Sequence, residues 1–324
     1  MKKLLALCGL LLVTAIAPAL AQDAAPAIPE TDSGNTAWLL VSTALVMLMT
    51  PGLAFFYAGM VSRKNVVSTL IQNYAALAVI GLLWVVIGYS LVFGENNPYI
   101  GGTGFAMLDG LMNTVYPGTG IPMYAFMAFQ MMFAIITPAL MTGSIAERVN
   151  FKAWILILAL WSLCVYVPVA HWVWGPSGWI LTLGGLDFAG GLVVHITAGV
   201  GGLVAAILFG KRISVHEESR PNDVSMIMIG AALLWFGWFG FNAGSALTSG
   251  FLAAHAFVTT HIGASAALVS KAVRCRRGHR SGCRSCDHYA CSRFRDGSFR
   301  HDHVLHFRYR LQPVRALPER ETQT

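Results

Sequence analysis

The chain has 324 residues, of which 56% are hydrophobic and only 11% charged, with a formal net charge of +7. Soluble domains carry about 25% charged residues, so this composition excludes a soluble multidomain enzyme. The basic balance does not indicate a nucleic-acid partner, because residues 271–324 alone hold 13 of the 22 Lys and Arg residues.

Residues 1–21 have the pattern of a secretory signal peptide. Lys2 and Lys3 form a basic start, residues 4–16 an apolar core, and the sequence Ala-Leu-Ala at 19–21 fits a cleavage site. The alternative is a short first membrane helix, which the break at Pro18 disfavours. Residues 22–36 are then expected to be a flexible, exported N-terminus.

Seven apolar segments follow, each near the ~20 residues that cross a bilayer. They lie at about 37–61, 67–93, 122–146, 151–171, 188–210, 224–242 and 251–270. We therefore expect an all-α polytopic membrane protein with residues 37–270 as its transmembrane domain.

Basic residues occur in alternate connections between these segments. They are Arg63 and Lys64, then Arg148 and Lys152, then Lys211, Arg212 and Arg220. Short loops rich in Lys and Arg stay cytoplasmic. The pattern predicts a multi-pass protein of the bacterial cytoplasmic (inner) membrane with its mature N-terminus outside, in agreement with the signal peptide.

A short internal repeat links the first and sixth segments. Residues 52–59 are Gly-Leu-Ala-Phe-Phe-Tyr-Ala-Gly, and residues 237–244 are Gly-Trp-Phe-Gly-Phe-Asn-Ala-Gly. A repeat offset of five helices inverts its second copy in the membrane, which is typical of transporters. Chance similarity between two Gly- and Phe-rich membrane segments is the alternative.

His195 is an ionisable residue in the middle of the fifth segment. On an α-helix, Gly191, Gly199 and Gly202 would share its face. Intramembrane ionisable residues by default mark a pathway. The alternative is a neutral imidazole hydrogen-bonded to a neighbouring helix, and the sequence does not decide between the two.

Other patterns first indicate structural roles. Phe126, Phe129, Gln130 and Phe133 lie at helical spacing, which is more typical of core packing than of a ligand site. Asp187 precedes the fifth helix, where an N-cap is expected. Glu147 and Arg148 lie at a cytoplasmic boundary, where we expect an interfacial ion pair.

Five strings, at 128–133, 143–148, 170–175, 187–196 and 237–246, resemble the ammonium transporters of the Amt/Mep/Rh family. The resemblance covers about residues 35–270. It implies ammonium or ammonia as the transported species, no enzyme activity and no cofactor. It also implies an eleven-helix protomer in a homotrimer, a pore between two inverted five-helix repeats, and a PII-type regulatory partner. The present chain would supply the first five-helix repeat and two helices of the second.

The resemblance carries three groups of roles onto this chain. An outer recruitment site is formed by Trp174, Phe129 and Ser245, with Asp187 as its supporting carboxylate. A pair of rings, Phe133 and Phe241, closes the pore, and His195 is a pore histidine. Aromatic faces attract a small cation by about 0.5–2 kcal/mol. A bare ion in hydrocarbon costs tens of kcal/mol in the Born limit, so it must shed a proton or be rehydrated before the apolar passage.

Residues 271–324 depart from the family and are basic and rich in Cys and His, with no apolar run. One interpretation is a small zinc module of Cys275, Cys283 and Cys286 with Cys291 or His288. The other is out-of-frame translation of a gene for further helices, which the abrupt loss of apolar periodicity favours, so no metal site is predicted.

Two functions follow for the whole chain. The first is ammonium or ammonia transport, and the alternative is a non-conducting fragment that assembles with or interferes with full-length subunits. An intramembrane enzyme lacks support, because the chain has neither His-Glu-x-x-His nor Gly-x-Ser-x-Gly.

Overall fold

The structure, a computed structural model, describes residues 29–212 and 221–280, and side chains as far as Ser270. The signal peptide expected at 1–21 and the tail beyond residue 280 lie outside the described residues. Seven helical spans in the described part are long and apolar enough to cross a membrane, in agreement with the seven predicted segments. They are Ser33–Met60, Arg63–Phe93, Met123–Ile145, Phe151–Thr182, Gly191–Leu208, Val224–Gly244 and Phe251–Ser270.

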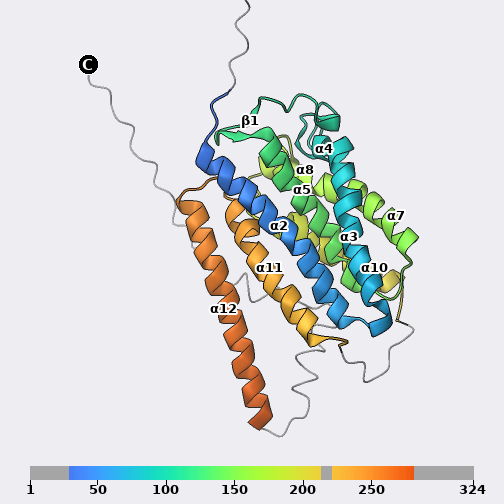
Figure 1. Cartoon of the computed structure of the whole chain (residues 1–324). Coiled ribbons are helices and arrows are strands. Elements are labelled where there is room, and N and C mark those ends of the chain that lie inside the picture. The colour runs from blue at the N-terminus through green and yellow to red at the C-terminus, as the bar shows by residue number, and fades with distance from the viewer. Residues whose placement is uncertain (1–28, 213–220, 281–324) are drawn as a thin grey trace, which may run out of the picture.

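The spans are built from α-helices with short π- and 3-10 turns, and one small β-hairpin lies at an end of the bundle (Figure 1). The α-helices are α2 (Ser33–Met60), α3 (Val66–Leu83), α4 (Tyr89–Phe93), α5 (Met123–Leu140), α6 (Thr142–Ile145), α7 (Phe151–Trp161), α8 (Val167–Trp174), α9 (Trp179–Thr182), α10 (Thr197–Leu208), α11 (Val224–Gly244) and α12 (Phe251–Arg280). The π-turns are η3 (Trp84–Gly88), η5 (Ser162–Tyr166) and η6 (Gly191–Ile196), and the 3-10 turns are η2 (Arg63–Asn65) and η4 (Ala106–Leu108). The hairpin pairs β1 (Val115–Tyr116) with β2 (Ile121–Pro122) in antiparallel register.

The helix α2 begins at Ser33, ahead of the apolar segment predicted from residue 37. The side chain of Asp32 accepts a hydrogen bond from the Asn35 backbone N–H at 2.7 Å. This N-cap satisfies a free donor of the first turn, so the helix extends into the polar sequence.

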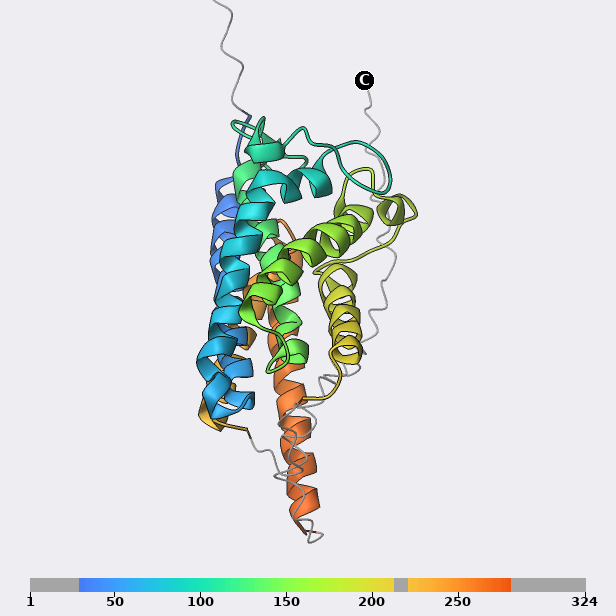
Figure 2. The same cartoon turned by 90° about the vertical axis from the view of Figure 1, so that its right-hand side faces the viewer.

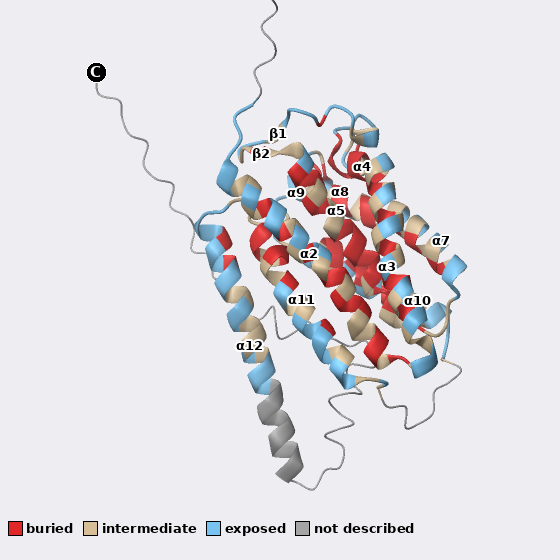
Figure 3. Cartoon of the chain, viewed as in Figure 1, coloured by how far each residue is buried: buried red, intermediate tan, exposed pale blue. Residues whose placement is uncertain are grey.

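The centre of the bundle is α5, on which α2, α3 and η6 converge (Figure 3). In the span of α5, 78% of the most apolar stretch is buried, whereas only 11% of that stretch is buried in the span of α12. The stripe of Phe126, Phe129, Gln130 and Phe133 is buried, so the predicted core packing is confirmed.

Glycines let α2 and α11 pack closely as an antiparallel pair. A Cβ on Gly52 would lie 3.3 Å from the Gly230 carbonyl oxygen, and one on Gly237 would lie 2.9 Å from that of Leu45. Gly237 follows Gly52 by the same number of positions as Gly230 follows Leu45. The two contacts are therefore reciprocal: exchanging the two helices turns one contact into the other. Small residues at a membrane helix interface permit this approach of backbones.

A second reciprocal pair of contacts lies at the two ends of the same interface. A Cβ on Gly59 would lie 2.7 Å from Ile227 Cγ1, and one on Gly244 would lie 2.5 Å from Ser42 Cβ. These residues keep the same offset as the first pair, so α2 and α11 present matching surfaces to each other.

The last helix, α12, packs on α11 and continues past residue 270 to Arg280. Figures 1 and 2 show its end extending beyond the rest of the bundle. The rings of Phe239 and Phe257 stack between the two helices with centroids 4.2 Å apart. Trp235 and His261 stack one turn further along, at 5.5 Å.

Polar contacts tie the connections together at the end of the bundle opposite the hairpin. Glu147 accepts hydrogen bonds from the Ser62 backbone N–H at 2.8 Å, from the Ser62 hydroxyl, and from Asn65 Nδ2 at 2.9 Å. Arg148 donates to the Ala206 carbonyl, and Arg212 donates to that of Gly143.

The ion pair that we expected between Glu147 and Arg148 is therefore replaced by a wider network. Burial raises the pKa of the Glu147 carboxyl, but hydrogen bonds from Ser62 and Asn65 and the charge of Arg212 lower it more. The net pKa lies below its ordinary value of 4.5. The charge that acts on Glu147 is that of Arg212, because the guanidinium of Arg148 is directed to the end of α10.

Candidate functional site

Four rings from four separate elements form one continuous series. Trp174 of α8 meets Phe133 of α5 edge to face at 5.8 Å between ring centroids, and Phe133 meets Phe241 of α11 at 4.4 Å. Phe241 in turn lies 5.9 Å from the imidazole of His195 in η6. Phe129, one turn before Phe133, packs on it at 4.9 Å. The structure thus brings together aromatic residues that are more than 100 positions apart in sequence.

Exposure changes along this series. Phe129, Phe133 and Phe241 are buried, with at most 2% of their surface exposed, whereas Trp174 and His195 are half-buried. A buried pair of rings therefore separates two more accessible positions. The tilt of 33° between Phe133 and Phe241 brings their faces together.

Asp187 organises the backbone beside Trp174. Its carboxylate accepts four backbone N–H groups, those of Gly190 and Gly191 at 2.7 Å and those of Leu192 and Val193 at 2.9 Å. Asp187 thus satisfies the free backbone N–H groups, as predicted, although the N-cap position itself is occupied by Gly190. The Asp187 carbonyl also accepts Trp174 Nε1–H at 2.9 Å, so the same residue fixes the indole ring.

Ser245 lies at the C-terminal end of α11, where its hydroxyl donates to the Phe241 carbonyl at 2.7 Å. The donor of the hydroxyl is used in this bond, so its oxygen lone pairs remain available to accept. The preceding Gly244 brings the helix end against Phe129, since a Cβ there would lie 2.9 Å from Phe129 Cε2.

His195 does not lie in an α-helix. Residues 191–196 form a π-turn in which the His195 N–H donates to the Gly190 carbonyl, five residues back, at 3.0 Å. The predicted common face assumed that Gly191, His195, Gly199 and Gly202 all lie on one α-helix. Gly191 and His195 lie instead in the π-turn, and only Gly199 and Gly202 lie in α10. Gly202 faces Ser144, whereas a Cβ on Gly199 would meet no heavy atom within 4 Å.

Two residues that matter for this geometry were not singled out from the sequence. Gly190 has a left-handed backbone with φ +86°, which the Gly-Gly pair after Asp187 could have indicated. His171 is fully buried, with Nδ1 2.7 Å from the Val92 carbonyl oxygen and Nε2 2.8 Å from that of Asn97. It anchors the loop after α4 onto α8.

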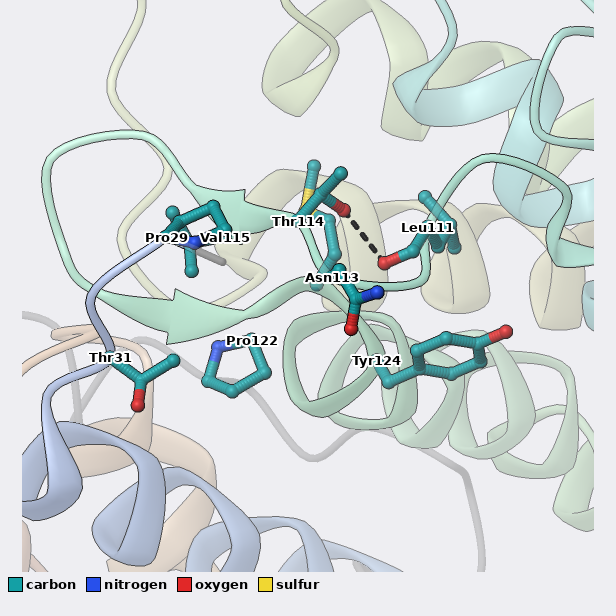
Figure 4. Close-up of a pocket in the computed structure, with 9 residues that line it drawn as sticks. Pro29, Thr31, Leu111, Asn113, Thr114, Val115, Pro122 and Tyr124 are labelled. Carbon is teal, nitrogen blue, oxygen red and sulfur yellow. Dashed lines mark hydrogen bonds between the residues drawn. The ribbon is translucent and has the colours of Figure 1, made fainter. Parts of the chain in front are cut away.

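A small pocket of about 180 Å³ lies apart from the ring series, beside the hairpin (Figure 4). Pro29, Val115, Pro122 and Tyr124 are among its lining residues, and none of the ring residues lines it. Within the described ranges, no group of three His, Cys, Asp or Glu side chains could hold a metal ion.

The seven apolar spans define a polytopic helical membrane protein. The sequence matches the Ammonium Transporter Family over residues 37–281, and the chain belongs to this family. This match ends close to the end of α12 at Arg280, later than the boundary near residue 270 that the motifs indicated.

The relatives of this chain are named as transporters rather than enzymes. Amt1 of Archaeoglobus fulgidus is 49% identical over 236 residues, covering 72% of this chain and 58% of the relative. An ammonium transporter of Bacillus subtilis is 49% identical over 238 residues, with the same coverage of 72% and 58%. The crystal structure of Candida albicans Mep2 superposes with a TM-score of 0.71 at 32% identity, covering 78% of this chain and 56% of Mep2. The chain thus spans less than two thirds of the length of these relatives.

Proposed function

We propose that this chain carries ammonium or ammonia across a bacterial cytoplasmic membrane. The observation that carries the proposal is the contiguous series from Trp174 through Phe133 and Phe241 to His195. Such a series offers ring faces to a cation at one end and an imidazole at the other.

Recruitment takes place at Trp174, Phe129 and Ser245 in this proposal. The indole ring attracts the cation by its negative face, a contribution of about 0.5–2 kcal/mol. The Ser245 hydroxyl oxygen accepts a hydrogen bond from the ion, because its own proton is given to the Phe241 carbonyl. Asp187 supports the site from behind by fixing the indole N–H.

Phe133 and Phe241 close the passage beyond that site. Their apolar faces disfavour a bare ion, so the passing species is neutral or crosses while the rings move apart. His195 lies directly behind Phe241, where an imidazole can accept and return a proton near neutral pH.

An inverted repeat is the second part of the proposal. The reciprocal contacts of Gly52 and Gly237, and of Gly59 and Gly244, support it, because equivalent positions of a two-fold related pair must make equivalent contacts. They also place the repeated strings of α2 and α11 at one shared interface, which chance similarity would not require.

The proposed orientation of the chain in the membrane is based on the positions of its basic residues. Arg148, Arg212 and the loop of Arg63 gather at the end of the bundle opposite the hairpin, which supports a cytoplasmic location for that end. The N-terminus is then outside. The homotrimer and the PII-type partner that the resemblance implies stay predictions.

The alternative is a polypeptide that does not conduct alone and acts by assembling with full-length subunits. The observation that favours it is the 58% coverage of the curated relatives. Growth on limiting ammonium of a host lacking its own transporters tests both functions. Growth restored by this chain alone supports transport. Absence of growth, with the chain present in the membrane and reduced uptake when it is co-expressed with a full-length relative, supports the alternative.

A further inference from the structure

The direction of His195 depends on the turn that contains it. The Gly190 carbonyl accepts the N–H of Val194 at 2.9 Å and that of His195 at 3.0 Å, so the change from α to π register occurs at this one oxygen. One residue on an α-helix corresponds to a rotation of about 100°. A change of register would therefore turn His195 away from Phe241.

The hydrogen-bond register of the turn determines which side chain faces Phe241, as the neighbours of His195 show. Val194 is fully buried, whereas 58% of the Ile196 side chain is exposed. Rotation by one residue would present one of these aliphatic side chains to Phe241 in place of the imidazole. Neither can exchange a proton.

Gly190 starts the π-turn for two reasons. Its φ of +86° is a conformation that residues with a Cβ rarely adopt. A Cβ there would also lie 2.6 Å from Val194 Cγ2 and 3.6 Å from the Trp174 ring. The Gly190 N–H is bound to the Asp187 carboxylate. This glycine therefore touches both the indole anchor and the turn of His195.

Thr197 closes the other end of the turn. Its hydroxyl donates to the Val193 carbonyl and lies 3.0 Å from that of Val194. The wider turn diverts backbone donors from their α-helical acceptors, and a threonine hydroxyl compensates for such a loss. Only 8% of Thr197 is exposed, so water does not replace it readily.

We propose that Gly190 and Thr197 are positioning residues that hold His195 towards Phe241 through the π-turn and couple its direction to the Asp187–Trp174 contact. The inference rests on the proposed function for its consequence in transport. The geometry of His195 can be measured without transport.

The experiment compares Gly190→Ala and Thr197→Val with two matched controls in lipid bilayers. Gly199→Ala adds a methyl group to the same helix in open space, and Thr259→Val removes a hydroxyl that donates to a carbonyl of α12. Solid-state NMR of labelled histidine follows the imidazole signals of His195, which are assigned by their loss in His195→Gln. The ring current of Phe241 is calibrated with Phe241→Ala.

Both test variants are expected to move the His195 signals towards their positions in Phe241→Ala, and both controls to leave them unchanged. In methylammonium uptake by vesicles, Thr197→Val should lower Vmax roughly tenfold with KM within about twofold, because Trp174 is untouched. Gly190→Ala should also raise KM.

Unchanged His195 signals in Thr197→Val would overturn the proposal, even if Gly190→Ala fails to fold. Moved signals with an unchanged Vmax would support the positioning role and overturn its consequence for transport. If the unmodified chain takes up no methylammonium, the proposed transport function fails, and the NMR comparison still decides whether the two residues position His195.

Discussion

At the scale of single residues, the proposed roles depend on which hydrogen-bonding atoms and ring faces remain available after the contacts within the protein are made. Asp187 accepts backbone N–H groups with both carboxylate oxygens, so in the proposed site it supports the cation indirectly rather than binding it. Trp174 donates its N–H to the Asp187 carbonyl, so we propose that it attracts the ion by its ring face.

Replacing Trp174 by Leu should weaken recruitment. A loss of about 0.5–2 kcal/mol of cation–π attraction corresponds to a rise of about 2- to 30-fold in the KM for methylammonium uptake. The control is Trp172→Leu, because Trp172 donates to the Tyr99 carbonyl at 2.8 Å and forms no ring contact with Phe133. Equal KM values for the two variants would argue against a recruiting role for Trp174.

The sequence predicted which side chains gather at the site but not how His195 is oriented. Family strings identified Trp174, Phe133, Phe241 and His195, and the N-cap pattern identified Asp187. The π-turn arises from the left-handed backbone of Gly190 and its bond to Asp187, which involve tertiary contacts that helical periodicity does not contain.

At the scale of elements, glycine permits the close packing of α2 and α11. The α2–α11 interface has glycine on both helices, and a Cβ on Gly230 would lie 2.5 Å from the Gly52 carbonyl oxygen. Hydropathy predicted where these helices lie in the sequence. It could not predict that the first and sixth would be neighbours, because lipid-facing and helix-facing surfaces are both apolar.

Gly230→Ala should therefore destabilise the bundle by about 1–3 kcal/mol, since the methyl group meets backbone that cannot move aside. Thermal unfolding in detergent measures this effect. Gly263→Ala on α12 is the control, because its Cβ would meet nothing within 4 Å and alanine favours a helix. A similar melting temperature for both variants would show that the close α2–α11 approach is not required.

The network around Glu147 gives a pH-dependent contribution to stability. The folded-state pKa of Glu147 lies below 4.5, so its stabilising effect is present above that pH and is lost as the pH falls through the lowered pKa. Glu147→Gln should lower the melting temperature near neutral pH and weaken its decrease on acidification below about 4.5. Glu95→Gln, in an exposed loop at the hairpin end, is the control. A Glu147→Gln protein with the melting curve of the unmodified chain at every pH would refute this role.

At the scale of the whole molecule, the bundle of seven spans, with α5 at its centre, brings four distant segments to one ring series. The number and positions of the spans could be predicted from apolar length. The family assignment followed from strings that lie at the ring series and at the basic end. The last predicted segment, 251–270, agrees with the span Phe251–Ser270, and α12 continues beyond it to Arg280 through basic residues that apolar length does not reveal.

We propose that ammonium is caught at Trp174 and that ammonium or ammonia then passes the Phe133–Phe241 pair to reach His195. The most direct measurement is methylammonium uptake, competed by ammonium, into vesicles that contain the purified chain. We expect saturable, competed uptake by the unmodified chain and its loss in the Trp174→Leu, His195→Ala double variant. Normal competed uptake by the double variant would contradict the proposed roles of Trp174 and His195.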